Sequence, residues 1–263
     1  MMRPDMVYQY PIWLAGLSLT AIAVIGTILL EFVIRRLVPH DVRQQHNEIA
    51  AAIFSIIGVT YAVLLAFVAM LAWEGLNKAK AASHMEAAQL MDVFQAARSL
   101  PEPTRRSFIG GLNDYATAVI GIEWPAQAEG QVVRAGDKYV GELDQLVADL
   151  GPVNQTNASI SMWLGQALMR LRDARQERLL AAETTIPGIV WFVLIVGGAI
   201  TIAFGSFLGS PSLRMHLGMC SLLAVSGVLV LVLIIALSSP FRGEFRISTA
   251  PFDYALSQIA NRR

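Results

Sequence analysis

Long runs of apolar residues, separated by polar segments, form the clearest pattern along this chain. Four largely uncharged windows contain about 20 residues each or more: 12–30, 49–73, 186–208 and 217–237. A helix of about 20 apolar residues is long enough to cross the roughly 30 Å hydrocarbon core of a bilayer. The pattern therefore predicts a polytopic membrane protein with four transmembrane helices.

The block between the second and third windows, residues 74–185, has a helical pattern. Apolar and small residues recur there at spacings of three and four: Leu76, Ala79, Ser83, Ala87, Leu90, Phe94 and Ala97. This spacing predicts that the second span continues as one long helix. Further helices are expected to end at residues 124–125 and 151–152, and a kink is expected at residues 187–188, because each pair contains proline. No alternation typical of strands is sustained, so the predicted fold class is all-α.

The segment after the fourth window has its own pattern. Pro240 is expected to end the last helix and Gly243 to permit a turn. Phe252, Leu256 and Ile259 then share one helical face, which indicates an interfacial or subunit-clasping amphipathic helix; a disordered tail is the alternative. The predicted organisation has four parts, listed by residue number: 1–73 with the first two spans, 74–185 as a helical block, 186–239 with the last two spans, and 240–263 as a turn and amphipathic segment.

Composition supports a membrane location. The chain has 263 residues, of which 55% are hydrophobic and only 15% charged, and its mean hydropathy is +0.52. Its 20 basic and 20 acidic residues cancel, which gives no electrostatic reason to expect nucleic acid as a partner. Lys and Arg near the spans are fewer on one side, where Arg35, Arg36, Arg43 and Arg214 lie. The positive-inside rule then predicts that both termini and residues 74–185 are cytoplasmic.

Known catalytic and cofactor motifs are missing from the sequence. It contains no HExxH, no phosphate-binding glycine loop and no GxSxG. The four histidines are scattered without metal-ligand spacing, and the single Cys220 excludes an internal disulfide framework and a multi-cysteine metal site. The predicted spans contain no ionisable residue near mid-membrane; Glu31 lies at one margin, where it can pair with Arg35 one helical turn away. We therefore predict no enzyme activity, no catalytic residue, no cofactor and no metal.

The second span has two contrasting faces. Small residues at helical spacing are suited to close helix packing, and the candidates for this role are Ser55, Gly58, Ala62 and Ala66. A neighbouring face carries bulky apolar residues, which are the candidate pore-lining residues: Phe54, Ile57, Tyr61, Leu64 and Val68. Two interpretations of the bulky face remain open. It packs against lipid or neighbouring helices, or it lines the axis of an oligomer as an apolar neck.

Several stretches together resemble one known family. They are, in chain order, His46-Asn47-Glu48, Gly58-Val59-Thr60-Tyr61-Ala62-Val63-Leu64-Leu65-Ala66-Phe67, Trp73-Glu74, Leu100-Pro101-Glu102, Glu123-Trp124-Pro125, Pro240-Phe241-Arg242-Gly243-Glu244-Phe245 and Pro251-Phe252. This ordered set is similar to the bestrophin-like family of bacterial membrane proteins, a domain family of unknown function, and the resemblance covers nearly the whole chain from about residue 40.

The resemblance extends more remotely to bestrophins, which are oligomeric anion channels with four spans, cytoplasmic termini and a pore lined by the second span. It implies a homo-oligomer in the bacterial inner membrane that contacts lipid and passes small anions through a neck formed by the second span. No acidic cluster resembles the calcium clasp of animal bestrophins, so calcium gating is not implied. The alternative is a non-conducting membrane scaffold or sensor whose cytoplasmic helices bind a partner.

Overall fold

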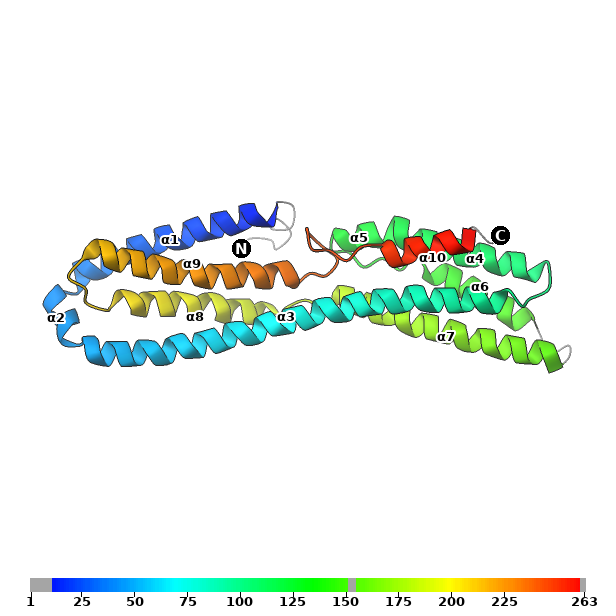
Figure 1. Ribbon diagram of the computed structural model, residues 1–263, viewed down its shortest axis with the longest axis horizontal. Coiled ribbons are helices and arrows are strands. Elements are labelled where there is room, and N and C mark those ends of the chain that lie inside the picture. The colour runs from blue at the N-terminus through cyan, green and yellow to red at the C-terminus, as the bar shows by residue number, and fades with distance from the viewer. Residues whose placement is uncertain (1–10, 151–154, 261–263) are drawn as a thin grey trace. The chain divides into compact units, whose positions relative to one another are not determined.

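The computed structural model describes residues 11–150 and 155–260, and within these ranges the regular elements are helices, with no strand (Figure 1). This confirms the all-α fold class. The chain divides into two compact units. Unit 1 combines Met1–Glu74 with Thr185–Ser238, and unit 2 combines Gly75–Thr184 with Ser239–Arg263.

Unit 1 contains the apolar helices. Its elements are α1 (Ile12–Leu37), α2 (His40–Gln45), the first half of α3 (Asn47–Ala97), α8 (Gly188–Ser206) and α9 (Leu213–Leu237). Helix α1 packs along α9, and α8 packs against both. Within residues 11–150 and 155–260, four helices are long and apolar enough to cross a membrane, as the four apolar windows predicted. Large apolar side chains such as Leu17, Ile22 and Leu222 are exposed on this unit, as expected for a surface in contact with lipid.

The polar segment before the second span has a structural role in unit 1. The side-chain amide of Asn47 donates to the carbonyl oxygen of Gly209 at 2.8 Å, and its oxygen accepts from the Gly209 amide at 2.7 Å. A Cβ atom at Gly209 would lie 2.9 Å from the backbone nitrogen of Gln44. Only glycine fits this close approach, so Asn47 and Gly209 together fix the α8–α9 connection to the start of α3.

Unit 2 is packed like a soluble domain. Its elements are the second half of α3, α4 (Thr104–Ala118), a π-helical turn η2 (Val119–Glu123), α5 (Trp124–Ala128), α6 (Asp137–Asp149), α7 (Gln155–Glu183) and α10 (Ala250–Ala260). The core of unit 2 includes the fully buried side chains of Phe94, Phe108, Leu143 and Phe252. The long helix predicted to continue from the second span is confirmed, because α3 is unbroken over its 51 residues.

Two proline pairs act differently from the prediction. Trp124-Pro125 does not end a helix: α4 passes through the η2 turn into α5, and Pro125 is accommodated in the first turn of α5, directly after the wider π-helical turn. Pro187-Gly188 does more than introduce a kink. Residues 184–187 are non-helical, and α8 begins afresh after Pro187. The pair at residues 151–152 lies outside the described residues.

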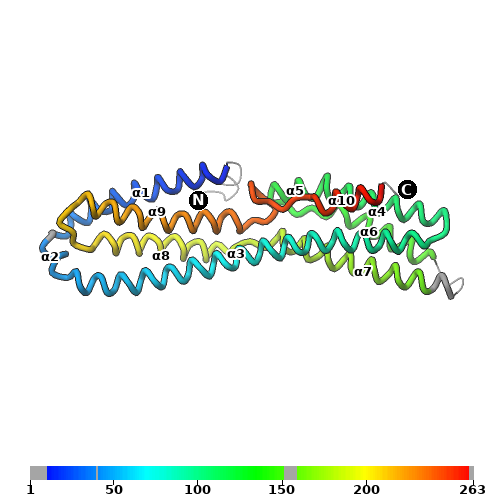
Figure 2. The backbone as a smooth tube through the Cα atoms, viewed as in Figure 1, coloured from blue at the N-terminus to red at the C-terminus, as the bar shows by residue number. Residues whose placement is uncertain are grey.

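The C-terminal segment is part of unit 2 (Figure 2). After Gly243, whose φ of +73° suits glycine, the chain returns and α10 lies beside α4. The side chains of Phe252, Ala255 and Ile259 are fully buried in the core. The amphipathic helix is therefore present as predicted, but its apolar face packs inside the protomer rather than on a membrane surface.

Candidate functional site

Two of the five candidate pore-lining residues, Tyr61 and Phe54, contact α8 of their own protomer. The hydroxyl group of Tyr61 donates to the carbonyl oxygen of Leu194 at 3.0 Å. A Cβ atom at Gly198 would lie only 2.7 Å from that hydroxyl oxygen, so glycine makes room for the tyrosine. Phe54 lies in the same way against Gly205: a Cβ atom added at Gly205 would lie 3.5 Å from a ring carbon of Phe54.

The other three candidates are also covered to different degrees. Val68 is buried, and Ile57 and Leu64 are half-buried. The bulky face is thus at least partly covered within unit 1, and a pore-lining role for its five residues stays a prediction. The opposite side of the helix is more exposed, and our proposal for the neck uses that side.

The opposite side of α3 is uncovered in the protomer. It carries the predicted packing residues Ser55, Ala62 and Ala66, which are exposed, and Gly58, whose added Cβ would meet no atom within 4 Å. We call these four the small-residue stripe. Next to it lies a row of larger apolar residues, which we call the free face: Ile56, Val59, Val63 and Phe67, exposed by 50% to 68%. Close packing of another helix against the small-residue stripe therefore stays a prediction. Since no helix of the same protomer covers the stripe, that helix would belong to a second copy of the chain.

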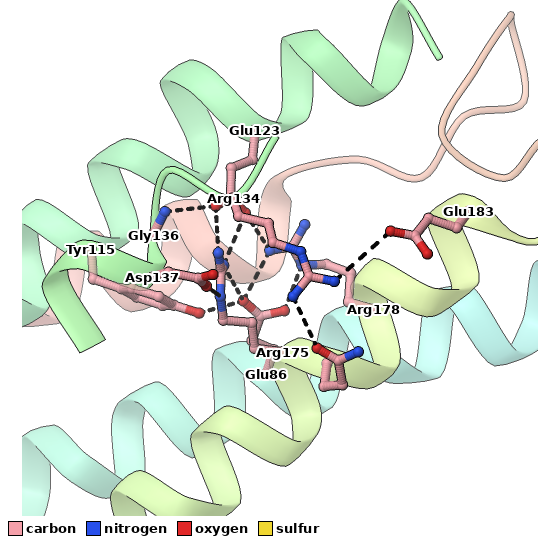
Figure 3. Close-up of polar contacts among 10 residues, drawn as sticks. Glu86, Tyr115, Glu123, Arg134, Gly136, Asp137, Arg175, Arg178 and Glu183 are labelled. Carbon is pink, nitrogen blue, oxygen red and sulfur yellow. Dashed lines mark hydrogen bonds and ion pairs between the residues drawn. The ribbon is translucent and has the colours of Figure 1, made fainter. Parts of the chain in front are cut away.

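Unit 2 contains a buried network of charged side chains (Figure 3). Arg175 on α7 binds the carboxylate of Glu123 through two nitrogens, at 2.9 and 2.7 Å. Arg178, one turn further along α7, donates to Glu123 at 2.7 Å and to Glu86 on α3 at 2.5 Å. The hydroxyl group of Tyr115 on α4 also donates to Glu86, at 2.5 Å. The network connects α3, α4, η2 and α7: its two arginines face two buried glutamates, and Arg175 Nε also binds the more exposed carboxylate of Asp137 on α6 at 2.8 Å.

The surroundings of the network favour its charged form. Burial alone would raise the pKa of Glu123, but the hydrogen bond from Arg175 and the positive charges of both arginines hold that pKa below its usual value. Burial raises the pKa of Tyr115 well above its ordinary value, and the negative charge of Glu86 adds to this. The guanidinium group of Arg178 also lies over the Trp124 ring, 5.3 Å from its centre. Each glutamate of the network binds at least one arginine, so the network is suited to holding helices together, although Arg178 Nη1 is buried without a hydrogen-bond partner.

Sequence reasoning did not find this network. Glu86 stands next to the apolar stripe of the long helix, and Arg175 and Arg178 are three residues apart on α7, which are the only local signals. Their pairing depends on contacts between helices far apart in the sequence. The pairing of Glu31 with Arg35, in contrast, is local and is confirmed: Arg35 Nε lies 2.7 Å from Glu31 Oε1.

The comparison with protein families decides the identity of the chain. The model of the Bestrophin-like domain matches residues 21–252. This protein belongs to the Bestrophin-like family. The resemblance drawn from its sequence motifs is therefore confirmed.

Solved structures support the fold of this Bestrophin-like protein. A crystal structure of a mutant bacterial bestrophin homologue from Klebsiella pneumoniae is similar with a TM-score of 0.71 and 12% sequence identity, over 92% of this chain and 98% of that one. A second mutant of that homologue gives a TM-score of 0.69 at 12% identity, over 92% and 99% of the two chains. At this identity the likeness concerns the fold. No curated protein matches the sequence.

Proposed function

We propose that this Bestrophin-like protein is a homo-oligomeric anion channel of a bacterial inner membrane, with an apolar neck lined by the free face of α3. The proposal rests mainly on one observation: the side of the second span that carries the free face is apolar and is not covered by the protomer. The side of α3 that carries Tyr61 and Val68 faces the interior of unit 1, where both side chains are covered. A ring of copies with α3 innermost would present the uncovered half to the axis.

The order of residues along α3 supports this arrangement. Each member of the small-residue stripe is followed directly by a member of the free face, as in Ala62-Val63 and Ala66-Phe67. Successive residues of an α-helix are rotated by about 100°, so the two rows run side by side along the helix. The stripe allows the close approach of a neighbouring copy. The free face then supplies a ring of larger apolar side chains beside that contact.

An apolar neck can control conduction without any charged group. Residues 49–73 contain no Asp, Glu, Lys or Arg. Hydrophobic constrictions gate by losing and regaining water, so widening the neck lowers the barrier to ions. The selectivity for anions rests on the resemblance to bestrophins. The proposed orientation, with both termini and residues 74–185 in the cytoplasm, rests on the distribution of Lys and Arg.

Cysteine accessibility tests the position of the neck. The native Cys220 is buried and gives a low background. We expect Phe67→Cys, in liposomes, to react with a membrane-impermeant anionic thiol reagent and to lose anion flux on reaction. Leu222→Cys, at an exposed position of α9, is the matched control and is expected to stay unlabelled because it faces lipid. Equal, slow labelling at both positions would contradict a water-filled path along the free face.

A non-conducting scaffold or sensor is the second candidate, and one feature of unit 2 favours it. Helix α7 exposes Met162, Trp163 and Met169, and a hollow of about 320 Å³ lies beside Trp163, lined by Asp92, Gln95, Ala167 and Arg170. Exposed apolar residues beside polar groups are typical of partner-binding surfaces. A folded, oligomeric protein without anion flux, whose Trp163→Ala variant loses a cytoplasmic partner, would favour this candidate.

A further inference from the structure

Three potential metal ligands converge in unit 1 where α1 packs against α9. They are Glu31 on α1 and, one turn apart on α9, His216 and Cys220. Their donor atoms all lie within 4.8 Å of one another. Glu31 Oε2 is 3.2 Å from His216 Nε2, which is 3.7 Å from Cys220 Sγ. All three residues are at most 4% exposed.

The spacing of these atoms suits a tetrahedral ion. Zinc binds nitrogen and oxygen at about 2.0–2.1 Å and sulfur at about 2.3 Å, which separates tetrahedral donors by roughly 3.3–3.6 Å. Two of the separations, 3.2 and 3.7 Å, bracket that range, and the third, between Glu31 Oε2 and Cys220 Sγ, is at most 4.8 Å. One carboxylate oxygen, one imidazole nitrogen and one thiolate form a donor set that zinc accepts, and they leave a fourth position for water.

A second observation points to a ligand at the same place. Glu31 Oε1 is held by Arg35 Nε at 2.7 Å and lies 3.5 Å from a guanidinium nitrogen of Arg43, which also donates to the carbonyl oxygen of Ser206 at 3.3 Å. Glu31 Oε2, which points toward His216 and Cys220, is buried and accepts no hydrogen bond. A buried carboxylate oxygen that accepts no hydrogen bond is costly, and a metal ion shared with His216 Nε2, 3.2 Å away, would satisfy it.

We propose that Glu31 Oε2, His216 Nε2 and Cys220 Sγ bind a divalent transition-metal ion, best zinc. On binding, the Cys220 thiol releases its proton to solvent and the thiolate forms the metal–sulfur bond, while His216 binds as neutral imidazole. Arg35 and Arg43 hold the other oxygen of Glu31 and so orient the carboxylate from outside the ligand set. The ion joins α1 to α9 at the end of unit 1 where α2 lies. Sequence analysis predicted no such site because Glu31 is far from the other two residues along the chain.

Cobalt is a suitable probe, since the protein has one cysteine. Full-length protein without a polyhistidine tag, purified in detergent, is titrated with Co²⁺, and zinc content is measured separately by elemental analysis. We expect one ion per protomer, a cobalt–thiolate charge-transfer band, and a rise in melting temperature with Zn²⁺ that a chelator reverses. The Cys220→Ser variant is expected to lose the band and to bind zinc more weakly by at least the 10- to 100-fold that loss of an outer-shell partner costs.

The exposed His84 provides a matched control: His84→Asn is expected to bind as the wild type does. The proposal is overturned if folded wild-type protein binds no stoichiometric metal and shows no thiolate band, as it would if a protonated His216 alone pairs with Glu31. It is also overturned if Cys220→Ser binds zinc as tightly as the wild type. Should Cys220→Ser fail to fold, the thiolate band and the thermal shift of the wild type decide the matter. The result is independent of conduction, because metal content is measured without ion flux.

Discussion

Tyr61 of the second span donates a hydrogen bond to the carbonyl oxygen of Leu194 in the third, and the two atoms are 3.0 Å apart. The side chain lies against Gly197 and Gly198, where an added Cβ atom would lie 3.0 Å from a ring carbon and 2.7 Å from the hydroxyl oxygen, respectively. This contact assigns Tyr61 to the packing of unit 1. The small residues of α8 are therefore complementary to a bulky residue of α3.

Truncating Tyr61 is expected to destabilise the protein rather than to open a pore. Tyr61→Ala removes a large, partly buried side chain, which costs about 1–3 kcal/mol, less than the loss of a fully buried ring, whereas Tyr61→Phe removes only the hydrogen bond and costs about 1 kcal/mol or less. Thermal unfolding in detergent measures both. A stable Tyr61→Ala variant with increased anion flux would contradict this and would indicate that the bulky face, not the free face, lines the neck.

Removing one charged member of the buried network is expected to lower the free energy of unfolding strongly. Glu123→Gln leaves Arg175 and Arg178 buried with one carboxylate fewer, so we expect a loss of about 3–5 kcal/mol. The control is Glu102→Gln, which breaks an exposed pair with Arg105 and should cost less than about 1 kcal/mol. Equal losses in a denaturation experiment would show that the network does not stabilise unit 2.

The same carboxylate predicts a dependence on pH. The pKa of Glu123 is below its usual value in the folded protein, because the hydrogen bond from Arg175 and the charges of both arginines outweigh the effect of burial. Its contribution is complete above the unfolded pKa of about 4.3 and is lost as the pH falls through the lower, folded pKa. Melting temperatures between pH 7 and pH 3 should fall less steeply at the acid end for Glu123→Gln than for the wild type. Parallel curves would contradict this.

The small-residue stripe predicts an effect on assembly. Within the protomer, a side chain at Gly58 meets open space. Gly58→Leu is therefore expected to leave the fold of the protomer intact and to reduce the mass of the oligomer, as measured by native mass spectrometry. Ala21→Leu, on an exposed position of α1, is the matched control. An unchanged oligomer in the Gly58 variant would exclude the stripe from the contact between copies.

The sequence was sufficient for features that depend on local pattern. Apolar windows predicted the spans, helical periodicity predicted the unbroken α3, and spacing predicted the pair of Glu31 and Arg35. It was not sufficient to choose the covered side of α3, since both sides are apolar and periodicity cannot distinguish lipid from protein. The signal lay on another helix, where Gly197, Gly198 and Gly205 provide the space.

Contacts between side chains far apart in the sequence could not be predicted either. Arginines and glutamates are expected on solvated surfaces, so nothing local indicates that Arg178 and Glu86 are fully buried together. In the same way, Glu31 meets His216 only through the packing of α1 on α9. The charge network and the cluster at Glu31 both form between helices that become neighbours only in the tertiary fold.

Anion flux through liposomes that contain the purified protein is the most direct test of the proposed channel. We expect the wild type to conduct anions, and Val63→Ala and Phe67→Ala to conduct more because a wider neck is more easily wetted. Leu222→Ala, on α9, should match the wild type. A folded, oligomeric wild type without flux would contradict the account, as would free-face variants whose flux equals that of the wild type.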